Sequence, residues 1–119
     1  MQGDGEVDGT AIEASLTATL QFIVQKNAGR SMRWPRAEDA SYYYAMGMDL
    51  DLNKAMQEAA QETVAFLRDQ KGLSAADAYA LASVAVDFRV AEAVDAVQMV
   101  YGMIPKRIFK QSVDYWSKR

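Results

Sequence analysis

The sequence contains no cysteine and no histidine. Without cysteine, the chain cannot form a disulfide scaffold, a thiolate zinc site or a cysteine nucleophile. Without histidine, it cannot build a Ser-His-Asp triad, a histidine proton shuttle or an imidazole metal site from its own residues. No apolar run reaches the roughly 18 residues that a membrane span needs. The chemistry left to this chain is that of carboxylates, hydroxyls, lysines and backbone groups.

The remaining composition is that of a small folded protein. The chain has 119 residues, of which 50% are apolar and 24% charged, which predicts one domain over residues 1–119 without an internal boundary. The formal net charge of −3 argues against a nucleic-acid partner. The N-terminus has no basic start followed by an apolar stretch, so we expect a cytoplasmic protein with no membrane partner.

Five basic residues gather near the C-terminus: Lys106, Arg107, Lys110, Lys118 and Arg119. We interpret them as a solvated terminus. A docking patch for an acidic surface is the alternative.

Residues 10–25 carry the clearest secondary-structure pattern. Apolar and polar side chains alternate there, and the apolar set is Ile12, Ala14, Leu16, Ala18, Leu20, Phe22 and Val24. A period of two predicts a long, half-buried β-strand. The other predicted elements offer few partners for a strand of this length, and an unpaired edge is prone to association. We therefore expect another copy or another polypeptide to complete the pairing.

The rest of the chain predicts a strand, two helices and a segment with two interpretations. Residues 42–48 are rich in aromatic residues and predict a strand. Residues 52–70 have helical periodicity, with Leu52, Met56, Ala59, Thr63, Phe66 and Leu67 on one face. Asp51 and Gly72 are suited to cap this helix, and Ser74 to Asp77 predicts the start of a second helix that runs to about residue 86. Residues 88–104 fit either a helix or strands broken near Asp95, and a short helix is expected at 108–116.

These elements indicate the α+β class: antiparallel β-strands with two consecutive helices packed on the sheet. Residues 1–9, MQGDGEVDG, predict a turn.

The acidic residues Asp4, Glu6 and Asp8 in this turn are the first candidate site. With Gly9 they match the opening of a calcium-binding EF-hand loop, but Ser15 stands where that loop needs a bidentate glutamate. Such carboxylates can still bind a hard cation or supply a general base. By spacing alone, a solvated turn is the preferred interpretation.

Two further groups of residues have open interpretations. Tyr42 to Tyr44 with Met46 and Met48 could line an apolar pocket, although core packing is the more common use of such residues. Asp87, Arg89, Glu92 and Asp95 could orient a substrate or form a surface ion-pair patch.

Several stretches taken together resemble the acetamidase/formamidase family of amide hydrolases. They follow the family's order across nearly the whole chain, and the most specific is the GDGEV-x-GTAIE stretch of residues 3–13. The others are Trp34-Pro35-Arg36, Gly72-Leu73-Ser74, Asp77 to Leu81, Ala85 to Val90, Val94-Asp95 and Ile104-Pro105-Lys106 with Ile108-Phe109.

The resemblance implies a hydrolase that converts short linear amides such as formamide and acetamide to the acid and ammonia. It implies Glu6 as the catalytic base or a metal contact, and Asp4, as the second choice, as a metal ligand or as a residue that only shapes the turn. It also implies a divalent metal, zinc or calcium, whose other ligands lie mostly outside this chain. Family chains are much longer, and this sequence resembles the C-terminal part of their larger β-rich fold. We therefore expect it to be inactive alone and to partner either the N-terminal part of the enzyme or a second copy as a homo-oligomer. A non-catalytic, homo-oligomeric structural module is the alternative function.

Overall fold

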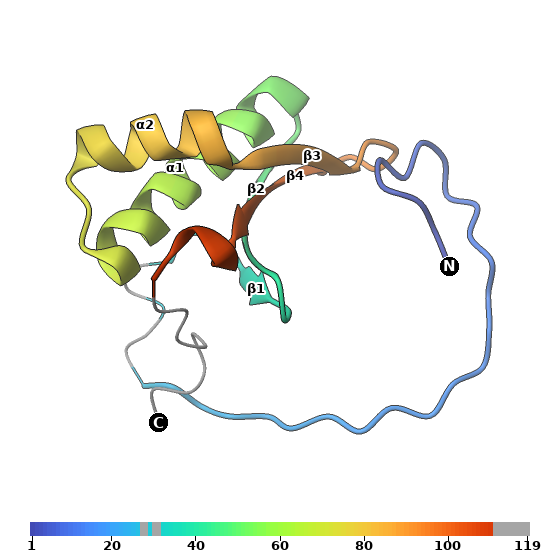
Figure 1. The fold of residues 1–119 in the computed structure, drawn as a ribbon. Coiled ribbons are helices and arrows are strands. Elements are labelled where there is room, and N and C mark those ends of the chain that lie inside the picture. The colour runs from blue at the N-terminus through green and yellow to red at the C-terminus, as the bar shows by residue number, and fades with distance from the viewer. Residues whose placement is uncertain (27–28, 30–31, 111–119) are drawn as a thin grey trace.

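The computed structural model describes residues 1–26, 29 and 32–110, and Figure 1 shows their arrangement. The elements follow one another as β1 (Arg36–Glu38), β2 (Tyr42–Asp49), α1 (Leu52–Lys71), α2 (Ala75–Ala85), β3 (Asp87–Glu92), β4 (Gln98–Pro105) and the 3₁₀ turn η2 (Lys106–Ile108). The ambiguous segment 88–104 is thus a pair of strands. The short strand β1 was not predicted.

The four strands form one antiparallel sheet in the order β1-β2-β4-β3. Both helices lie on one face of this sheet (Figure 1). The buried positions alternate along β2, where Tyr43, Ala45 and Gly47 point toward the helices. Ala45 is opposite Gly102 of β4, so both central strands present small residues to the helical layer. The predicted α+β class, with two consecutive helices packed on an antiparallel sheet, is confirmed.

Helix α1 lies unusually close to the sheet because small residues meet at the contact. An added Cβ on Gly47 would lie 2.1 Å from the backbone nitrogen of Ala59 and 2.4 Å from the carbonyl oxygen of Ala55. An added Cβ on Gly102 would lie 2.6 Å from the hydroxyl of Thr63. Residues 55, 59 and 63 are spaced by one helical turn, so they form one face of α1. These contacts fix the position of α1 over β2 and β4.

The ends of the helices follow the sequence signals. Asp51 accepts a hydrogen bond from the backbone of Asn53, and Gly72 ends α1 with a φ of 69° in the left-handed region. Ser74 accepts from the backbone of Asp77 at 3.1 Å and begins α2. Both helix starts and the end of α1 were predicted correctly.

The predicted buried face of α1 was wrong at two positions. Met56, placed on the buried face, is 37% exposed, whereas Glu62, placed off it, is buried. Glu62 tolerates burial because it pairs with Arg36 of β1 at 3.1 Å, and the two side chains are only 8% and 3% exposed. The sequence pattern could not anticipate a charge on this face, because its partner lies 26 residues away.

The predicted strand at residues 10–25 is not formed in this chain. These residues belong to no strand and arc away from the sheet (Figure 1). Leu16 and Phe22 are 81% and 89% exposed. The backbone N–H of Ile12 donates to the carbonyl oxygen of Met1 at 2.9 Å, which closes the N-terminal turn on itself and not on the sheet. The pattern of a strand is present, but the described part of the chain provides no neighbouring strand.

The second face of the sheet carries apolar side chains and is not covered by the helices. We call it the open face, and it consists of Tyr42, Tyr44, Met46, Met48, Met99, Tyr101 and Met103. These residues alternate with the buried positions of β2 and β4, so they point to the opposite side. Tyr44 and Tyr101 contact each other edge to face, with ring centroids 5.8 Å apart. The helices α1 and α2 contact the sheet only from its other side (Figure 1).

The basic residues near the C-terminus are not all solvated. Lys106 is 7% exposed and pairs with the carboxylate of Glu38 at 2.7 Å. The interpretation of a solvated terminus was therefore wrong for Lys106, although Arg107 and Lys110 are exposed. The short helix expected at 108–116 falls largely outside the described residues, as do Lys118 and Arg119. None of the described helices is long and apolar enough to cross a membrane.

Candidate active site at the edge of the open face

The acidic N-terminal turn lies against β3 and β4. Asp4 accepts from the guanidinium of Arg89 at 3.1 Å, across 85 residues of sequence. Burial, and then a hydrogen bond with Asp4, raises the pKa of Tyr101. Arg89 is opposite Tyr101 in the sheet register, so both side chains belong to the open face. The turn is thus held at one corner of that face.

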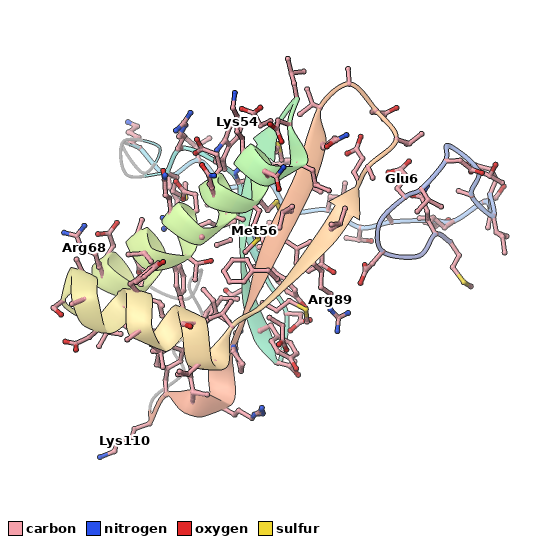
Figure 2. The ribbon with its side chains drawn as sticks, turned by 90° about the horizontal axis from the view of Figure 1, so that it is seen from above. Glu6, Lys54, Met56, Arg68, Arg89 and Lys110 are labelled. Atoms are coloured by element: carbon pink, nitrogen blue, oxygen red, sulfur yellow. The ribbon has the colours of Figure 1, made fainter. Side chains whose placement is uncertain are left out.

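Glu6 follows Asp4 in a constrained backbone. Gly5 has a φ of 98° and Glu6 has a φ of 33°, and Glu6 is the only non-glycine residue with positive φ among those described. Positive φ is unfavourable for a residue with a Cβ, so contacts around the turn must hold it. Figure 2 shows Glu6 beside the loop that joins β3 to β4, and Arg89 on the side of β3 away from the helices.

Glu92 and Asp95 complete the acidic part of the site. A bulge at residue 91 shifts the register, so that Glu92 is opposite Met99 of the open face. A hydrogen bond with Asp95 is the largest cause that raises the pKa of Glu92, followed by burial and the negative charges of Asp95 and Glu6. The carboxyl groups of Asp95 and Glu6 therefore lie close enough to Glu92, at the end of the β3–β4 hairpin, to raise its pKa.

From the sequence, one group was predicted from four charged residues: Asp87, Arg89, Glu92 and Asp95. Their proximity to the acidic turn was not predicted. The structure separates this patch, because Arg89 contacts Asp4 whereas Glu92 and Asp95 contact each other. No local pattern could have shown this. The bulge and the approach of a segment 85 residues earlier are both tertiary features.

The turn does not form a metal site by itself. Among residues 1–26, 29 and 32–110, no group of three or more aspartates or glutamates is arranged to hold a metal ion. Asp4 is paired with Arg89, and Asp8 accepts from the backbone of Thr10, which lowers the pKa of Asp8. These carboxylates satisfy their hydrogen bonds within the protein. The prediction that Asp4 binds a metal therefore needs ligands beyond these residues.

The tyrosine and methionine run divides between the two sides of the sheet. Tyr43 is in the core, with its ring centroid 4.9 Å from that of Phe66. Tyr44 points to the open face, where its hydroxyl donates to Asp39 at 2.6 Å. This hydrogen bond, aided by burial, raises the pKa of Tyr44 to about 12. The core-packing interpretation thus holds for Tyr43, whereas Tyr42, Tyr44, Met46 and Met48 belong to the open face. An apolar pocket lined by this run stays a prediction.

Comparisons with known proteins agree with this architecture. A model of the Acetamidase/Formamidase family matches residues 1–111, so the chain belongs to that family. The solved acetamidase of Yersinia enterocolitica is 29% identical, with a TM-score of 0.64 over 67% of this chain and 24% of that one. The solved acetamidase of Bacillus halodurans is 21% identical, with a TM-score of 0.62 over 68% of this chain and 28% of that one. No curated protein matches the sequence.

The chain spans about a quarter of the length of these two acetamidases. Its sheet and helices are consistent with part of a larger fold. The family membership supports an amide hydrolase by resemblance.

Proposed function

We propose that this chain is the C-terminal portion of an amide hydrolase that converts short linear amides, such as formamide and acetamide, to the carboxylate and ammonia. The observation that carries the proposal is the GDGE turn at residues 3–6, which is anchored to the sheet through Asp4 and Arg89 in a chain of this family. The anchor places the carboxylate of Glu6 at an uncovered corner of the sheet. In this proposal the amide binds above that corner, next to the carboxylate of Glu6.

In this proposal Glu6 is the general base. It accepts a proton from the water that attacks the amide carbonyl, and the departing nitrogen then needs a proton to leave as ammonia. Glu92 is the carboxyl group in the site with a raised pKa, first because it shares a hydrogen bond with Asp95. A carboxyl group with a raised pKa retains its proton to higher pH, which suits the donor of that second proton.

The proposal also includes a divalent metal, zinc or calcium, in the complete enzyme. The described residues contain no group of three aspartates or glutamates that could hold a metal ion. The metal would therefore take most of its ligands from outside this chain. Asp4 would contribute one ligand by exchanging its ion pair with Arg89 for the metal. No step of the reaction is derived through the metal. The chain alone is expected to be inactive, and the complete enzyme is expected in the cytoplasm.

Ammonia release from formamide and acetamide tests this proposal. We would compare the 119-residue chain with a polypeptide extended upstream to the length of the solved acetamidases, each with and without added zinc or calcium. Activity is expected only in the longer polypeptide, and Glu6→Gln there should lower kcat by about 10²- to 10⁴-fold. Asp69→Asn, which removes an exposed carboxylate on α1, is the matched control and should leave kcat unchanged. Full activity of the Glu6→Gln variant would refute the role of Glu6.

A non-catalytic, homo-oligomeric module is the second candidate function. The exposed, alternating side chains of residues 10–25 favour it, because such a segment can pair with its copy in another molecule. Light scattering during size-exclusion chromatography measures the oligomeric state. A stable dimer without amidase activity in the longer polypeptide would favour this candidate over the hydrolase.

A further inference from the structure

Two apolar surfaces of this chain lack a counterpart among its described residues. One is the open face of the sheet, with its four methionines and three tyrosines. The other is the segment 11–24, whose apolar side chains alternate with polar ones and are exposed to solvent. Monomeric proteins rarely leave contiguous apolar patches larger than a few hundred Å² exposed. Both surfaces therefore indicate a partner.

The size of the open face shows that it is only part of an interface. Two strands of eight residues at ~3.4 Å each, spaced ~4.8 Å apart, give a face on the order of 260 Å² over β2 and β4. A stable interface needs about 800 Å² on each partner. The segment 11–24 would contribute the remaining interface area.

The comparisons indicate what the partner is. The family model covers residues 1–111, so the exposed segment is family sequence and not an unrelated extension. The superposition leaves about three quarters of each solved acetamidase unmatched, and it covers about two thirds of this chain. A family segment with the pattern of a strand, but without a neighbouring strand among the described residues, can find that neighbour in the remaining three quarters.

The charges around the surface agree with this partner. Over β2 and β4 the open face is uncharged, and the charged residues on the same side of the sheet, Asp87, Arg89 and Glu92, all lie on the edge strand β3. Arg89 is already paired with Asp4. A second β-sheet can therefore pack over β2 and β4 without burying an isolated charge, because facing sheets interlock apolar side chains. The same sheet would cover the corner that holds Glu6, because the acidic turn is attached through Asp4 to Arg89 on this side of the sheet.

We propose that the open face and the segment 11–24 together bind a polypeptide corresponding to the upstream three quarters of an acetamidase. That polypeptide lays a second β-sheet on the open face and pairs one of its edge strands with residues 11–24. This inference rests on the proposed function, because it takes the partner from the same enzyme class.

Co-expression tests the proposal. The probe is the Yersinia enterocolitica acetamidase without the whole region that aligns with residues 1–111 of this chain, produced in the same cells as the tagged 119-residue chain. The expected result is a complex with one copy of each polypeptide. Met46→Lys on the open face and Leu20→Lys in the segment should each lower the yield of the complex about tenfold or more, since each buries an unpaired ammonium group.

Tyr79→Lys is the matched control. Tyr79 lies on α2, on the other side of the molecule from the open face, and is 69% exposed, so this variant should form the complex as well as the unchanged chain does. Urea unfolding of the isolated variants checks that they fold. Met46→Lys and Leu20→Lys should keep the unfolding midpoint of the unchanged chain, because neither side chain packs against the helical layer.

Three outcomes would overturn the proposal. The first is the absence of a complex with the unchanged chain. The second is a complex that tolerates both lysine substitutions. The third is a homodimer of this chain that dissociates when either lysine substitution is made. In that case a second copy of the chain, and not the upstream polypeptide, would cover the two apolar surfaces. Ammonia release from the purified complex separates this proposal from the proposed function: a complex without amidase activity supports docking and contradicts hydrolysis.

Discussion

Strand β2 and the segment 10–25 are both predicted as strands from the sequence, but only β2 forms one. In β2, every second residue is buried against the helices, and the strand pairs with β1 on one side and β4 on the other. The segment alternates for twice that length, yet Leu20 and Val24 are 72% and 88% exposed. The difference does not lie in the local sequence. Alternation describes what a strand could bury, whereas the neighbouring chain decides whether it does.

The comparison separates two sources of stability. The unit from β1 to β4 is held by contacts between distant residues, such as Gly47 with α1 and Arg36 with Glu62. The N-terminal residues are attached to it mainly where Asp4 meets Arg89, between two half-exposed side chains. Substitutions in the first region should therefore change the free energy of unfolding, while those in the second should change only association.

The largest effect is expected for Gly47→Val. Its Cβ would lie 2.1 Å from a backbone atom of α1, and neither the helix nor the strand can move away without breaking other contacts. We expect a loss of about 4 kcal/mol or more in the free energy of unfolding, a large share of the total for a small domain. Urea denaturation followed by circular dichroism measures it. Gly9→Val, where no atom lies within 4 Å of the added Cβ, is the control and should be neutral.

The next largest effect is expected for Glu62→Gln. The substitution leaves the guanidinium of Arg36, which is 3% exposed, without its counter-charge. The free energy of unfolding should fall by about 3 kcal/mol, as when other buried ion pairs lose one partner. Glu58→Gln is the matched comparison, because its partner Arg33 is 63% exposed, and it should cost less than about 1 kcal/mol. Equal losses in both variants would show that burial of Arg36 carries no penalty.

Asp51→Ala tests the start of α1 and has a smaller expected effect. The carboxylate accepts from the backbone nitrogen of Asn53 at 2.9 Å, and alanine leaves this donor without a protein partner. A loss of about 1 kcal/mol in the free energy of unfolding is expected. Asp69→Ala, near the other end of the same helix, removes an equal charge without removing a cap. If both variants have the same unfolding midpoint, the cap does not contribute.

The elements that were predictable are those whose signals are local. Asp51, Gly72 and Ser74 act on their immediate neighbours, so the limits of the helices followed from the sequence. The burial of Glu62 and Lys106 was not predictable, because each depends on an ion-pair partner in β1. The same holds for the candidate site. The acidic turn was recognisable as a motif, but its contact with Arg89 arises only when β3 and β4 pair.

The pairing of Tyr44 with Asp39 predicts a pH dependence at the edge of the open face. The pKa of Tyr44 is raised to about 12 by its hydrogen bond to the carboxylate and then by burial, whereas an unfolded tyrosine titrates near pH ~10. Between these values the unfolded chain has lost the proton that the folded chain keeps. The free energy of unfolding therefore falls as the pH rises through this window, and the contribution is complete below it.

Ultraviolet absorbance follows the ionisation of tyrosines as the pH rises. The difference between the titration curves of the unchanged chain and the Tyr44→Phe variant gives the ionisation of Tyr44. Asp39→Asn removes the negative charge but keeps an acceptor, so the pKa of Tyr44 should move back toward its ordinary value. An unchanged pKa in that variant would mean that burial alone is responsible.

The smallest effect is expected for Leu16→Ser, in the segment that lacks a partner. The side chain is 81% exposed, so its removal deletes almost no packing, and the free energy of unfolding should change by less than about 0.5 kcal/mol. Leu67→Ser makes the same chemical change at a fully buried position of α1 and should cost several kcal/mol, on the order of 3 or more. Urea unfolding of the two variants side by side sharpens the comparison of the two regions. A measurable loss in Leu16→Ser would mean that the segment packs on its own chain in solution, which would contradict its role as a surface for another polypeptide.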